Sequence, residues 1–411
     1  ISKPTSELIT PSEEKGRGVF SPSLAMGDED MTDDDCRLSR RRFLKAGAAA
    51  GRAAILGGPS VQALAAQGST KTTHTSNGLD ITIAGYPVDH VRALADGRVQ
   101  VDGCNATFQP GKIGDLNTHV FSGPQELEVT EIGLSPFMLA YANEGFRDYS
   151  LIPVFPIRLF RHKSVFVHGD RGIERPEDLK GRRIGTPGYS STSLTWIRGF
   201  MQHEYGVKPE DVEWVVSAAD SSAKDAGKVS KQESVVPDGI SISVGPEGKD
   251  ESEMLVDGDV DALFHAAEPR AFAAGHPKIK RLFGDSRVTE RDYFQRTGIF
   301  PIMHAVAMRN DVIDAHPWLP EAVFNAYSRA KQKQYEAMQM QWIFGTLPWY
   351  GQELEETRAV MGENFWPYGI EANRKTLEAL FQYSYEQGLA KKRLTVEELF
   401  HPSSLDLMDI T

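Results

Sequence analysis

Residues 152–168 read IPVFPIRLFRHKSVFVH, a stretch that joins two guanidinium groups and an imidazole to the start of a predicted strand. Two prolines stiffen the backbone ahead of Arg158, Arg161 and His162. Arginine offers a planar fork of donors that matches a carboxylate at two points, and histidine exchanges a proton near neutral pH. The segment therefore favours a small acidic ligand, although a solvated basic turn after a buried strand would give the same pattern.

Predicted strands alternate with predicted helices on both sides of this stretch. Residues 79–84 alternate apolar and polar side chains as a first strand does, and residues 164–168 form a further strand. A helix is predicted over 190–205, closed by Gly206. This alternation indicates an α/β fold in which mainly parallel sheets carry helices on both faces. We expect 164–168 to lead into a second lobe and the strand at 305–309 to lead back.

The first lobe also contains three shorter predicted elements. A short helix is expected over 88–94, and a turn with a second strand over 97–103, with its two valines on one face. The segment 128–135 is typical of a short strand that ends in a loop.

The chain has 411 residues, enough for two ordinary domains, and it divides into six predicted segments. The segments are an acidic stretch without stable structure over 1–38, an export signal over 39–65, a linker over 66–78, the first part of lobe 1 over 79–163, lobe 2 over 164–304, and the second part of lobe 1 with C-terminal helices over 305–411.

The predicted signal has charged, small-residue and cleavage regions in the expected order. The stretch SRRRFLK at 39–45 is followed by Ala/Gly-rich sequence and by Ala63-Leu64-Ala65. Arginines with Phe-Leu-Lys behind them are typical of a twin-arginine leader, which makes the twin-arginine translocation machinery an expected partner. Cleavage near Ala65 predicts a periplasmic or exported mature protein. The alternative is a basic amphipathic helix on a domain surface.

Composition excludes several classes of protein. Apolar residues make up 40% and charged residues 25% of the chain, as in soluble globular proteins. The net charge of −12 argues against a nucleic-acid partner. Removal of the signal would leave Cys104 as one thiol, which excludes a disulfide scaffold. No segment outside the signal is apolar enough to be predicted to span a bilayer.

Several stretches in consistent order carry a family resemblance. They are DHVRAL at 89–94 with DGRV at 96–99, IPVFP at 152–156 with FRH at 160–162, GTP at 185–187 with RGF at 198–200, GIFPIMH at 298–304, and FWPYGIE at 365–371. In these stretches the chain resembles the 4,5-dihydroxyphthalate decarboxylases. The resemblance implies a two-lobed fold like that of type II periplasmic binding proteins, with a ligand cleft between the lobes.

The resemblance also implies an activity: decarboxylation of a hydroxylated aromatic dicarboxylate such as 4,5-dihydroxyphthalate to protocatechuate and CO₂, without an organic cofactor. The bond between the ring carbon and the departing carboxylate can break without forming a costly aryl carbanion. This requires that the ring carbon is protonated first and that a hydroxyl para to it supplies electrons. The site then needs a general acid, cations for the carboxylate that stays, and a hydrogen bond or base at the para hydroxyl. The alternative is an exported solute receptor that passes a small aromatic or carboxylic acid to an ABC-type membrane permease.

Nine residues are candidates for this site. His162 and His304 are expected to transfer protons, and Arg158 and Arg161 to hold carboxylates. His304 could instead be a buried structural histidine. Residues 189–192 lie where a strand-to-helix loop would present hydroxyls and free N–H groups, although a helix N-cap explains them equally well. The predicted substrate-binding residues are Arg158, Arg161, His90, Tyr189, Ser190, Ser191 and Thr192.

No metal site and no organic cofactor are predicted. The sequence has no His-x-x-x-His or Glu-paired helical ligand set, and no phosphate-binding glycine loop follows the first strand. A divalent ion held by residues distant in the sequence stays an open alternative. His265, with Glu268 close behind it, is a further candidate in the second lobe.

Overall fold

The computed structural model describes residues 78–409 of the chain. All of these residues belong to one compact unit, Thr70–Thr411. The predicted acidic segment, export signal and most of the linker lie outside the described residues, so their expected roles stay predictions. Among the helices of the described part, none combines the length and the apolar character that crossing a membrane requires.

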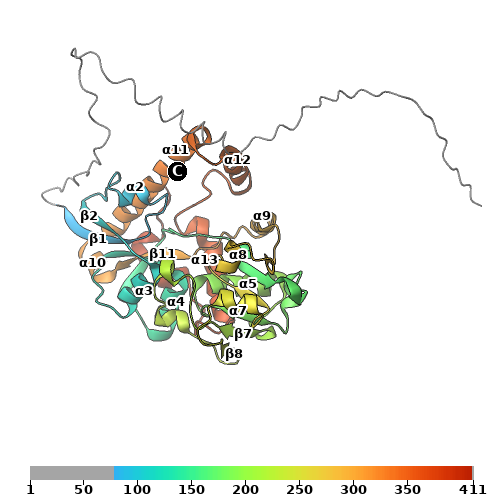
Figure 1. Cartoon of the computed structure of the whole chain (residues 1–411). Coiled ribbons are helices and arrows are strands. Elements are labelled where there is room, and N and C mark those ends of the chain that lie inside the picture. The colour runs from blue at the N-terminus through green and yellow to red at the C-terminus, as the bar shows by residue number, and fades with distance from the viewer. Residues whose placement is uncertain (1–77, 410–411) are drawn as a thin grey trace, which may run out of the picture. The chain divides into compact units, whose positions relative to one another are not determined.

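The first sheet has five strands in the order β2-β1-β3-β11-β4. Figure 1 labels β1, β2 and β11 of this sheet. Strand β1 pairs in parallel with β2 and β3, whereas β11 runs antiparallel to β3 and β4. The last strand in the sequence therefore lies inside the sheet, because the chain returns to it after building the second sheet. The strands are β1 (Leu79–Gly85), β2 (Cys104–Pro110), β3 (Val129–Gly133), β4 (Tyr149–Ile152) and β11 (His304–Arg309).

The second sheet has six strands in the order β10-β5-β9-β6-β7-β8. Strands β9, β6, β7 and β8 are parallel to one another, and β5 is antiparallel to β9 and β10. Two sheets, each flanked by helices, confirm the predicted α/β class. The second sheet is mainly parallel, whereas the first is mixed, with two parallel and two antiparallel pairings. The strands are β5 (Val165–His168), β6 (Arg183–Thr186), β7 (Glu213–Val216), β8 (Ile242–Val244), β9 (Ala262–Phe264) and β10 (Ile279–Arg281).

Helices cover both sheets, and α13 packs on α5 (Figure 1). On the first sheet, α3 packs on β3, and the long helix α11 packs on α2. The helices are α2 (Arg92–Ala95), α3 (Ile113–Phe121), α4 (Leu134–Leu139), α5 (Thr192–Tyr205), α6 (Ala223–Ala226), α7 (Glu251–Asp257), α8 (Arg270–Ala273), α9 (Ser286–Thr297), α10 (Asn310–Ala315), α11 (Leu319–Phe344), α12 (Tyr350–Met361), α13 (Arg374–Glu386) and α14 (Val396–Leu399).

Helix α5 confirms the sequence prediction closely. It ends at Gly206, whose φ of 64° is the left-handed C-cap conformation that glycine adopts without strain. It begins at Thr192 rather than at Ser190, because the Ser190 hydroxyl donates a hydrogen bond to the carbonyl of Gln232 (2.8 Å). The first turn of this helix therefore opens at the end of β6, where the functional site is built.

The predicted second strand is wrong in position. Strand β2 begins at Cys104, and residues 97–103 form a loop instead. Gly97 and Gly103 have φ values of 79° and 78°, a left-handed conformation that no strand residue adopts. The predicted helix at 88–94 is also shorter, because only Arg92–Ala95 is helical.

A candidate active site between the two sheets

A cavity of about 620 Å³ lies where strand ends from the two sheets meet. The first sheet supplies Tyr86 after β1, Gly133 at the end of β3 and His304 at the start of β11. The second sheet supplies Pro187 after β6 and Ala266 after β9. Because β11 runs antiparallel to β3, its first residue lies at the edge where β3 ends. Ligands bind at this carboxyl edge of parallel strands in open α/β sheets, which makes the cavity the candidate active site.

A buried glutamate holds His304 at the cavity wall. Nδ1 of His304 lies 2.5 Å from Oε1 of Glu131, and the other carboxylate oxygen accepts the backbone N–H of Tyr86 (2.9 Å). The Glu131 side chain is 2% exposed and that of His304 16% exposed. With Glu131 as the acceptor at Nδ1, the other ring nitrogen, Nε2, is left for the cavity. A histidine oriented by a carboxylate in this way is a common acid–base arrangement.

The backbone after β1 leaves room for this pair. A Cβ on Gly85 would lie 2.8 Å from Oε2 of Glu131, so only glycine fits there without a shift of the carboxylate. The ring of Tyr86 stacks on His304 at 6.2 Å between centroids. The Tyr86 hydroxyl accepts the N–H of Ile113 (3.0 Å) and donates to the carbonyl of Asp225 (3.2 Å), and burial raises its pKa. The imidazole is therefore held by its carboxylate and by a neighbouring ring.

Arg161 places a cation on the same cavity. Its Nη1 donates to the carbonyl of Ala266 (2.7 Å), and its Nε approaches the sulfur of Met303 at 3.3 Å. Burial lowers the pKa of Arg161 to about 10, so the guanidinium stays charged at neutral pH. Among the described residues no hydrogen bond occupies Nη2, which leaves a donor for a carboxylate.

The first turn of α5 lies beside this cation. Ser191 is its N-cap residue, and Thr192, Ser193 and Leu194 line the cavity with it. N–H groups in the first turn of a helix have no acceptor within the helix, and this end carries partial positive charge. The Thr192 hydroxyl accepts the N–H of Ser135 at 3.0 Å, which ties the helix start to the first lobe. Arg161 and this turn together give the cavity hydrogen-bond donors and positive charge that suit an anion.

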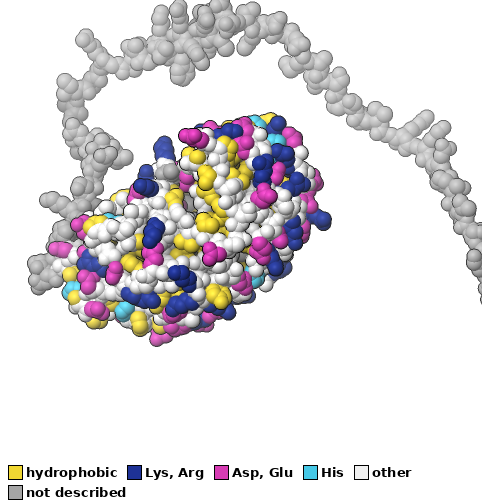
Figure 2. Space-filling model, turned by 90° about the horizontal axis from the view of Figure 1, so that it is seen from below, with side chains coloured by type: hydrophobic (Ala, Val, Ile, Leu, Met, Phe, Trp, Pro, Cys, Tyr) yellow, Lys and Arg dark blue, Asp and Glu magenta, His cyan; other side chains and the backbone are white. Residues whose placement is uncertain are grey.

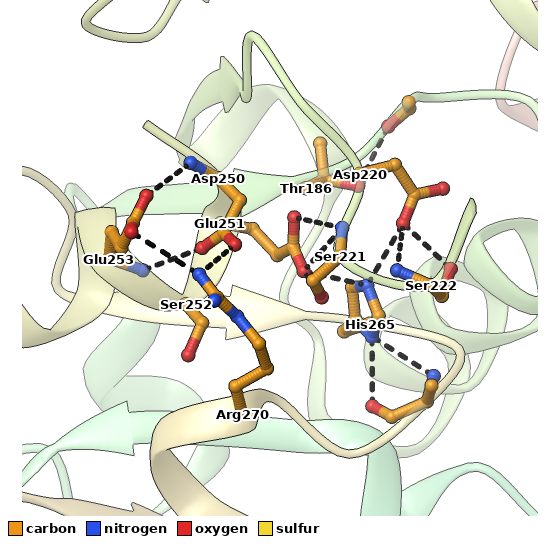
Figure 3. Close-up of polar contacts among 12 residues, drawn as sticks. Thr186, Asp220, Ser221, Ser222, Asp250, Glu251, Ser252, Glu253, His265 and Arg270 are labelled. Atoms are coloured by element: carbon orange, nitrogen blue, oxygen red, sulfur yellow. Dashed lines mark hydrogen bonds and ion pairs between the residues drawn. The ribbon is translucent and has the colours of Figure 1, made fainter. Parts of the chain in front are cut away.

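Acidic side chains also line the cavity. Asp220 lines it and lies near the buried pair of Glu251 and His265 (Figure 3). Nε2 of His265 is 3.1 Å from Glu251 and 3.7 Å from Asp220, and Nδ1 is 2.8 Å from the carbonyl of Ala267. Burial alone would lower the pKa of His265, but the two carboxylates raise it to about 9. The other acidic residues at the cavity are Asp225, Glu233 and Glu268.

His162 and Arg158 lie in the core rather than at the cavity, which corrects the expected convergence. The His162 ring is 1% exposed and stacks on Phe200 at 4.2 Å, with neither nitrogen hydrogen-bonded. Burial lowers its pKa to about 4, so the ring is neutral. Arg158 donates to the carbonyls of Phe300 (2.8 Å) and Pro367 (3.2 Å). The His162 imidazole is therefore enclosed by apolar packing and the Arg158 guanidinium is bonded to backbone carbonyls, so neither is available for the predicted chemistry.

Three further predicted residues also lie outside the cavity lining. Nε2 of His90 is 2.9 Å from the carbonyl of Pro156. Tyr189 is buried beneath the guanidinium of Arg198, which lies 3.8 Å from its ring centroid, and Ser190 is fully buried. Of the nine predicted residues, the cavity therefore brings together Arg161, Ser191, Thr192 and His304.

Sequence reasoning missed the residues that complete the site. Glu131 and Tyr86 were not singled out, nor were Asp220 and Glu251. One signal was available for Glu131, because it interrupts a segment predicted as a strand, and a carboxylate that a strand buries needs a partner. The partner itself lies 173 positions away at His304, so no local pattern identifies it.

The surface outside the cavity has a mixed character. Figure 2 shows Lys, Arg, Asp and Glu side chains interspersed over one face, with hydrophobic side chains gathered in a streak across it. No single sign of charge dominates the face in this view.

Comparisons with known proteins give one family-model match and two similar curated proteins of the same name. Residues 157–230 match the family model "NMT1/THI5 like". The chain is 35% identical over 333 residues to 4,5-dihydroxyphthalate decarboxylase of Comamonas testosteroni, across 81% of this chain and 99% of the relative. It is 33% identical over 219 residues to the enzyme of that name from Pseudomonas putida, across 53% of this chain and 83% of the relative.

Solved structures show more distant likeness. The periplasmic aliphatic sulphonate binding protein SsuA of Escherichia coli aligns with a TM-score of 0.46 at 13% identity, over 78% of this chain and 97% of that one. The desulfurization enzyme DSZB aligns with a TM-score of 0.46 at 15% identity, over 80% and 97%.

Proposed function

Because the chain belongs to the 4,5-dihydroxyphthalate decarboxylase family, we propose that it decarboxylates a hydroxylated aromatic ortho-dicarboxylate. The expected substrate is 4,5-dihydroxyphthalate, and the products are protocatechuate and CO₂. The observation that carries the proposal is the pairing of His304 with Glu131 at the cavity, because this reaction requires a proton donor.

In the proposed mechanism His304, in its protonated form, donates a proton from Nε2 to the ring carbon that bears the departing carboxylate. The hydroxyl para to that carbon supplies the electron pair and passes its own proton to an acidic side chain of the cavity, so that the ring becomes a dienone while the carboxylate remains attached. The carbon–carbon bond then breaks and CO₂ leaves. The electron pair of that bond restores the aromatic ring, and the hydroxyl oxygen takes its proton back from the acidic side chain. The net change is one proton gained and one CO₂ lost, and a proton from solvent restores His304.

The cavity offers both kinds of group that this substrate needs. Arg161 and the first turn of α5 provide donors for the carboxylates. Asp220 and the other acidic side chains of the lining provide acceptors for the ring hydroxyls. The volume of about 620 Å³ lies within the range of about 300–1,000 Å³ of ordinary small-molecule sites.

We further propose that the protein is exported by the twin-arginine route, on the strength of residues 39–45 and of Ala63-Leu64-Ala65. Replacement of the three arginines at 40–42 by lysine should leave the precursor in the cytoplasm, whereas the wild-type chain should appear outside it in shortened form. Equal processing of both chains, measured by fractionation and mass spectrometry, would contradict this route.

The test of the activity is CO₂ release from 4,5-dihydroxyphthalate by purified protein, with protocatechuate followed by chromatography. Phthalate, which lacks the para hydroxyl, should raise the melting temperature without being turned over. His304→Ala should lower kcat by at least about 100-fold with little change in affinity, as expected for loss of a general acid. His162→Phe is the matched control and should keep most of the activity.

Two results would contradict the proposal. Tight binding of 4,5-dihydroxyphthalate by the wild-type protein without CO₂ release would indicate the receptor alternative. Unchanged turnover in His304→Ala would remove this histidine from the mechanism.

A further inference from the structure

We propose that Asp220, Glu251 and His265 bind a divalent transition-metal ion, zinc or manganese, in the wall of the cavity (Figure 3). These residues are distant in the sequence but meet at the ends of neighbouring elements. Asp220 follows β7, Glu251 is the first residue of α7, and His265 directly follows β9. One imidazole with two carboxylates is a donor set that both ions accept.

The three donor atoms have nearly the spacing of a coordination sphere. One ligand atom from each residue lies within 4.8 Å of the other two. Nε2 of His265 is 3.1 Å from Oε1 of Glu251 and 3.7 Å from Oδ1 of Asp220. Bonds of about 2.0–2.2 Å to one zinc ion place its ligand atoms about 3–3.5 Å apart, so small side-chain rotations complete the site.

The orientation of the histidine is the second observation that points to a ligand. His265 is 0% exposed, and its Nδ1 lies 2.8 Å from the carbonyl oxygen and 3.0 Å from the amide nitrogen of Ala267. When Nδ1 carries the proton, it donates to the nearer carbonyl oxygen. A metal-binding histidine usually donates its other ring N–H to such an oxygen, which fixes the tautomer that presents Nε2 to the metal. Nε2 itself is buried without a well-formed hydrogen bond and is aimed at the two carboxylates.

The site opens toward the cavity on one side only. Glu251 is fully buried, whereas the Asp220 side chain is 16% exposed and lines the cavity. An ion held here by three protein ligands keeps coordination positions on the cavity side for a small oxygen ligand. The positive charge of the ion would also offset the negative charge of the acidic side chains that line the cavity. Chelation of a substrate hydroxyl or carboxylate by the ion rests on the proposed function, but binding of the ion itself does not.

The test uses the full chain, stripped with a chelator and titrated with zinc chloride or manganese chloride by calorimetry in the absence of substrate. We expect one ion per chain. His265→Ala and Glu251→Gln should each weaken binding at least tenfold. Glu253→Gln is the matched control, because Glu253 also belongs to α7 but contacts Arg270 at 3.2 Å instead of the cluster. Circular dichroism checks that each variant is folded.

A second measurement does not depend on the variants. X-ray absorption of the zinc-loaded wild-type protein should show imidazole scattering together with oxygen ligands. The proposal would be overturned if no metal binds, if all variants bind with equal affinity, or if the bound zinc has no imidazole ligand. The cluster would then be a protonated His265 paired with two carboxylates. Because the metal titration contains no substrate, failure to bind metal leaves the decarboxylase proposal intact. Conversely, a protein that binds metal but does not turn over 4,5-dihydroxyphthalate contradicts only the decarboxylase proposal.

Discussion

At the scale of single residues, two histidines in matching family stretches have opposite surroundings. His304 has a carboxylate at 2.5 Å and lines the cavity, whereas the ring of His162 packs against three aromatic rings and neither of its nitrogens is hydrogen-bonded. A buried imidazole without a partner is held in its neutral form, because burial penalises the charged one. Position in the fold, rather than residue type, therefore separates a candidate acid from a packing residue.

The role of Glu131 predicts a specific kinetic effect. Glu131→Gln keeps the shape of the side chain but removes the charge that orients His304 through Nδ1. We expect kcat for CO₂ release to fall about 10- to 100-fold while KM changes little, since Glu131 does not line the cavity. Glu128→Gln is the control, because Glu128 accepts the N–H of Thr82 away from His304. A change in KM alone would indicate a binding role instead.

The buried ring of His162 predicts a pH-dependent stability. Its pKa falls from 6.5 to about 4 in the folded chain. Between these two pH values the unfolded chain binds a proton at this ring and the folded chain does not. The free energy of unfolding therefore decreases as the pH is lowered from about 6.5 to about 4, by up to about 3 kcal/mol from this ring. In His162→Phe this loss is absent. Urea unfolding at several pH values should show that the free energy of unfolding of the variant increases relative to that of the wild type as the pH drops below about 6.5. A constant difference would contradict the shifted pKa.

At the scale of elements, a single glycine sets the distance between α5 and α13. A Cβ on Gly199 would lie 2.0 Å from the ring of Tyr383, closer than side chains can approach. The helix that carries the anion-binding turn is thus seated directly on α13, and the helices are joined further by Arg198, whose Nε donates to Gln387 (2.9 Å). Close packing at this point supports the position of the first turn at the cavity.

Gly199→Ala should therefore destabilise the protein despite the better helix propensity of alanine. The propensity gain is about 1 kcal/mol, and the overpacking penalty is about 1–3 kcal/mol, increased by the rigidity of the Tyr383 ring. Gly351→Ala, in α12, is the control: its Cβ would meet Trp342 at an ordinary 3.5 Å. Thermal unfolding should give a lower melting temperature for the first variant only, and an unchanged value for both would contradict this packing.

At the scale of the whole molecule, the C-terminal end is tied to the long helix α11 by a buried ion pair. Lys331 is fully buried and pairs with Asp409. Its Nζ also donates to Asn364 and to the carbonyl of Trp366, each at 3.0 Å. Asp409 in turn accepts the N–H of Tyr368 at 3.0 Å. These contacts therefore join α11, residues 364–368 and Asp409, which are distant in the sequence.

Asp409→Ala should lower the free energy of unfolding. The variant leaves a buried ammonium without its counter-charge, which typically costs about 3–5 kcal/mol. Asp406→Ala, at an exposed position three residues earlier, is the control and should be nearly neutral. Denaturant unfolding measures both. Equal stability of the two variants would show that the tail does not secure α11.

The fold was largely predictable, and the site only in part. The strand at 79–84 and the helix closed by Gly206 follow from local periodicity and capping, and both are confirmed. Arg161 and His304 were identified by residue type within family stretches, and both line the cavity. Arg158 has the same residue type three positions earlier, but it bridges to Ile302 in an antiparallel pair and bonds to backbone carbonyls.

The sequence by itself determined the alternation of strands and helices, the end of α5 at Gly206 and the family. These depend on neighbouring residues, and side-chain periodicity and capping act over a few positions. Only the tertiary structure decided that Glu131 meets His304 and that Glu251 meets His265. The antiparallel pairing of β11 with β3 brings His304 to the end of the strand that carries Glu131, and the packing of α7 on β9 brings Glu251 to His265. The direction of a buried polar side chain is set by the partner that compensates its desolvation, and that partner comes from a distant part of the chain.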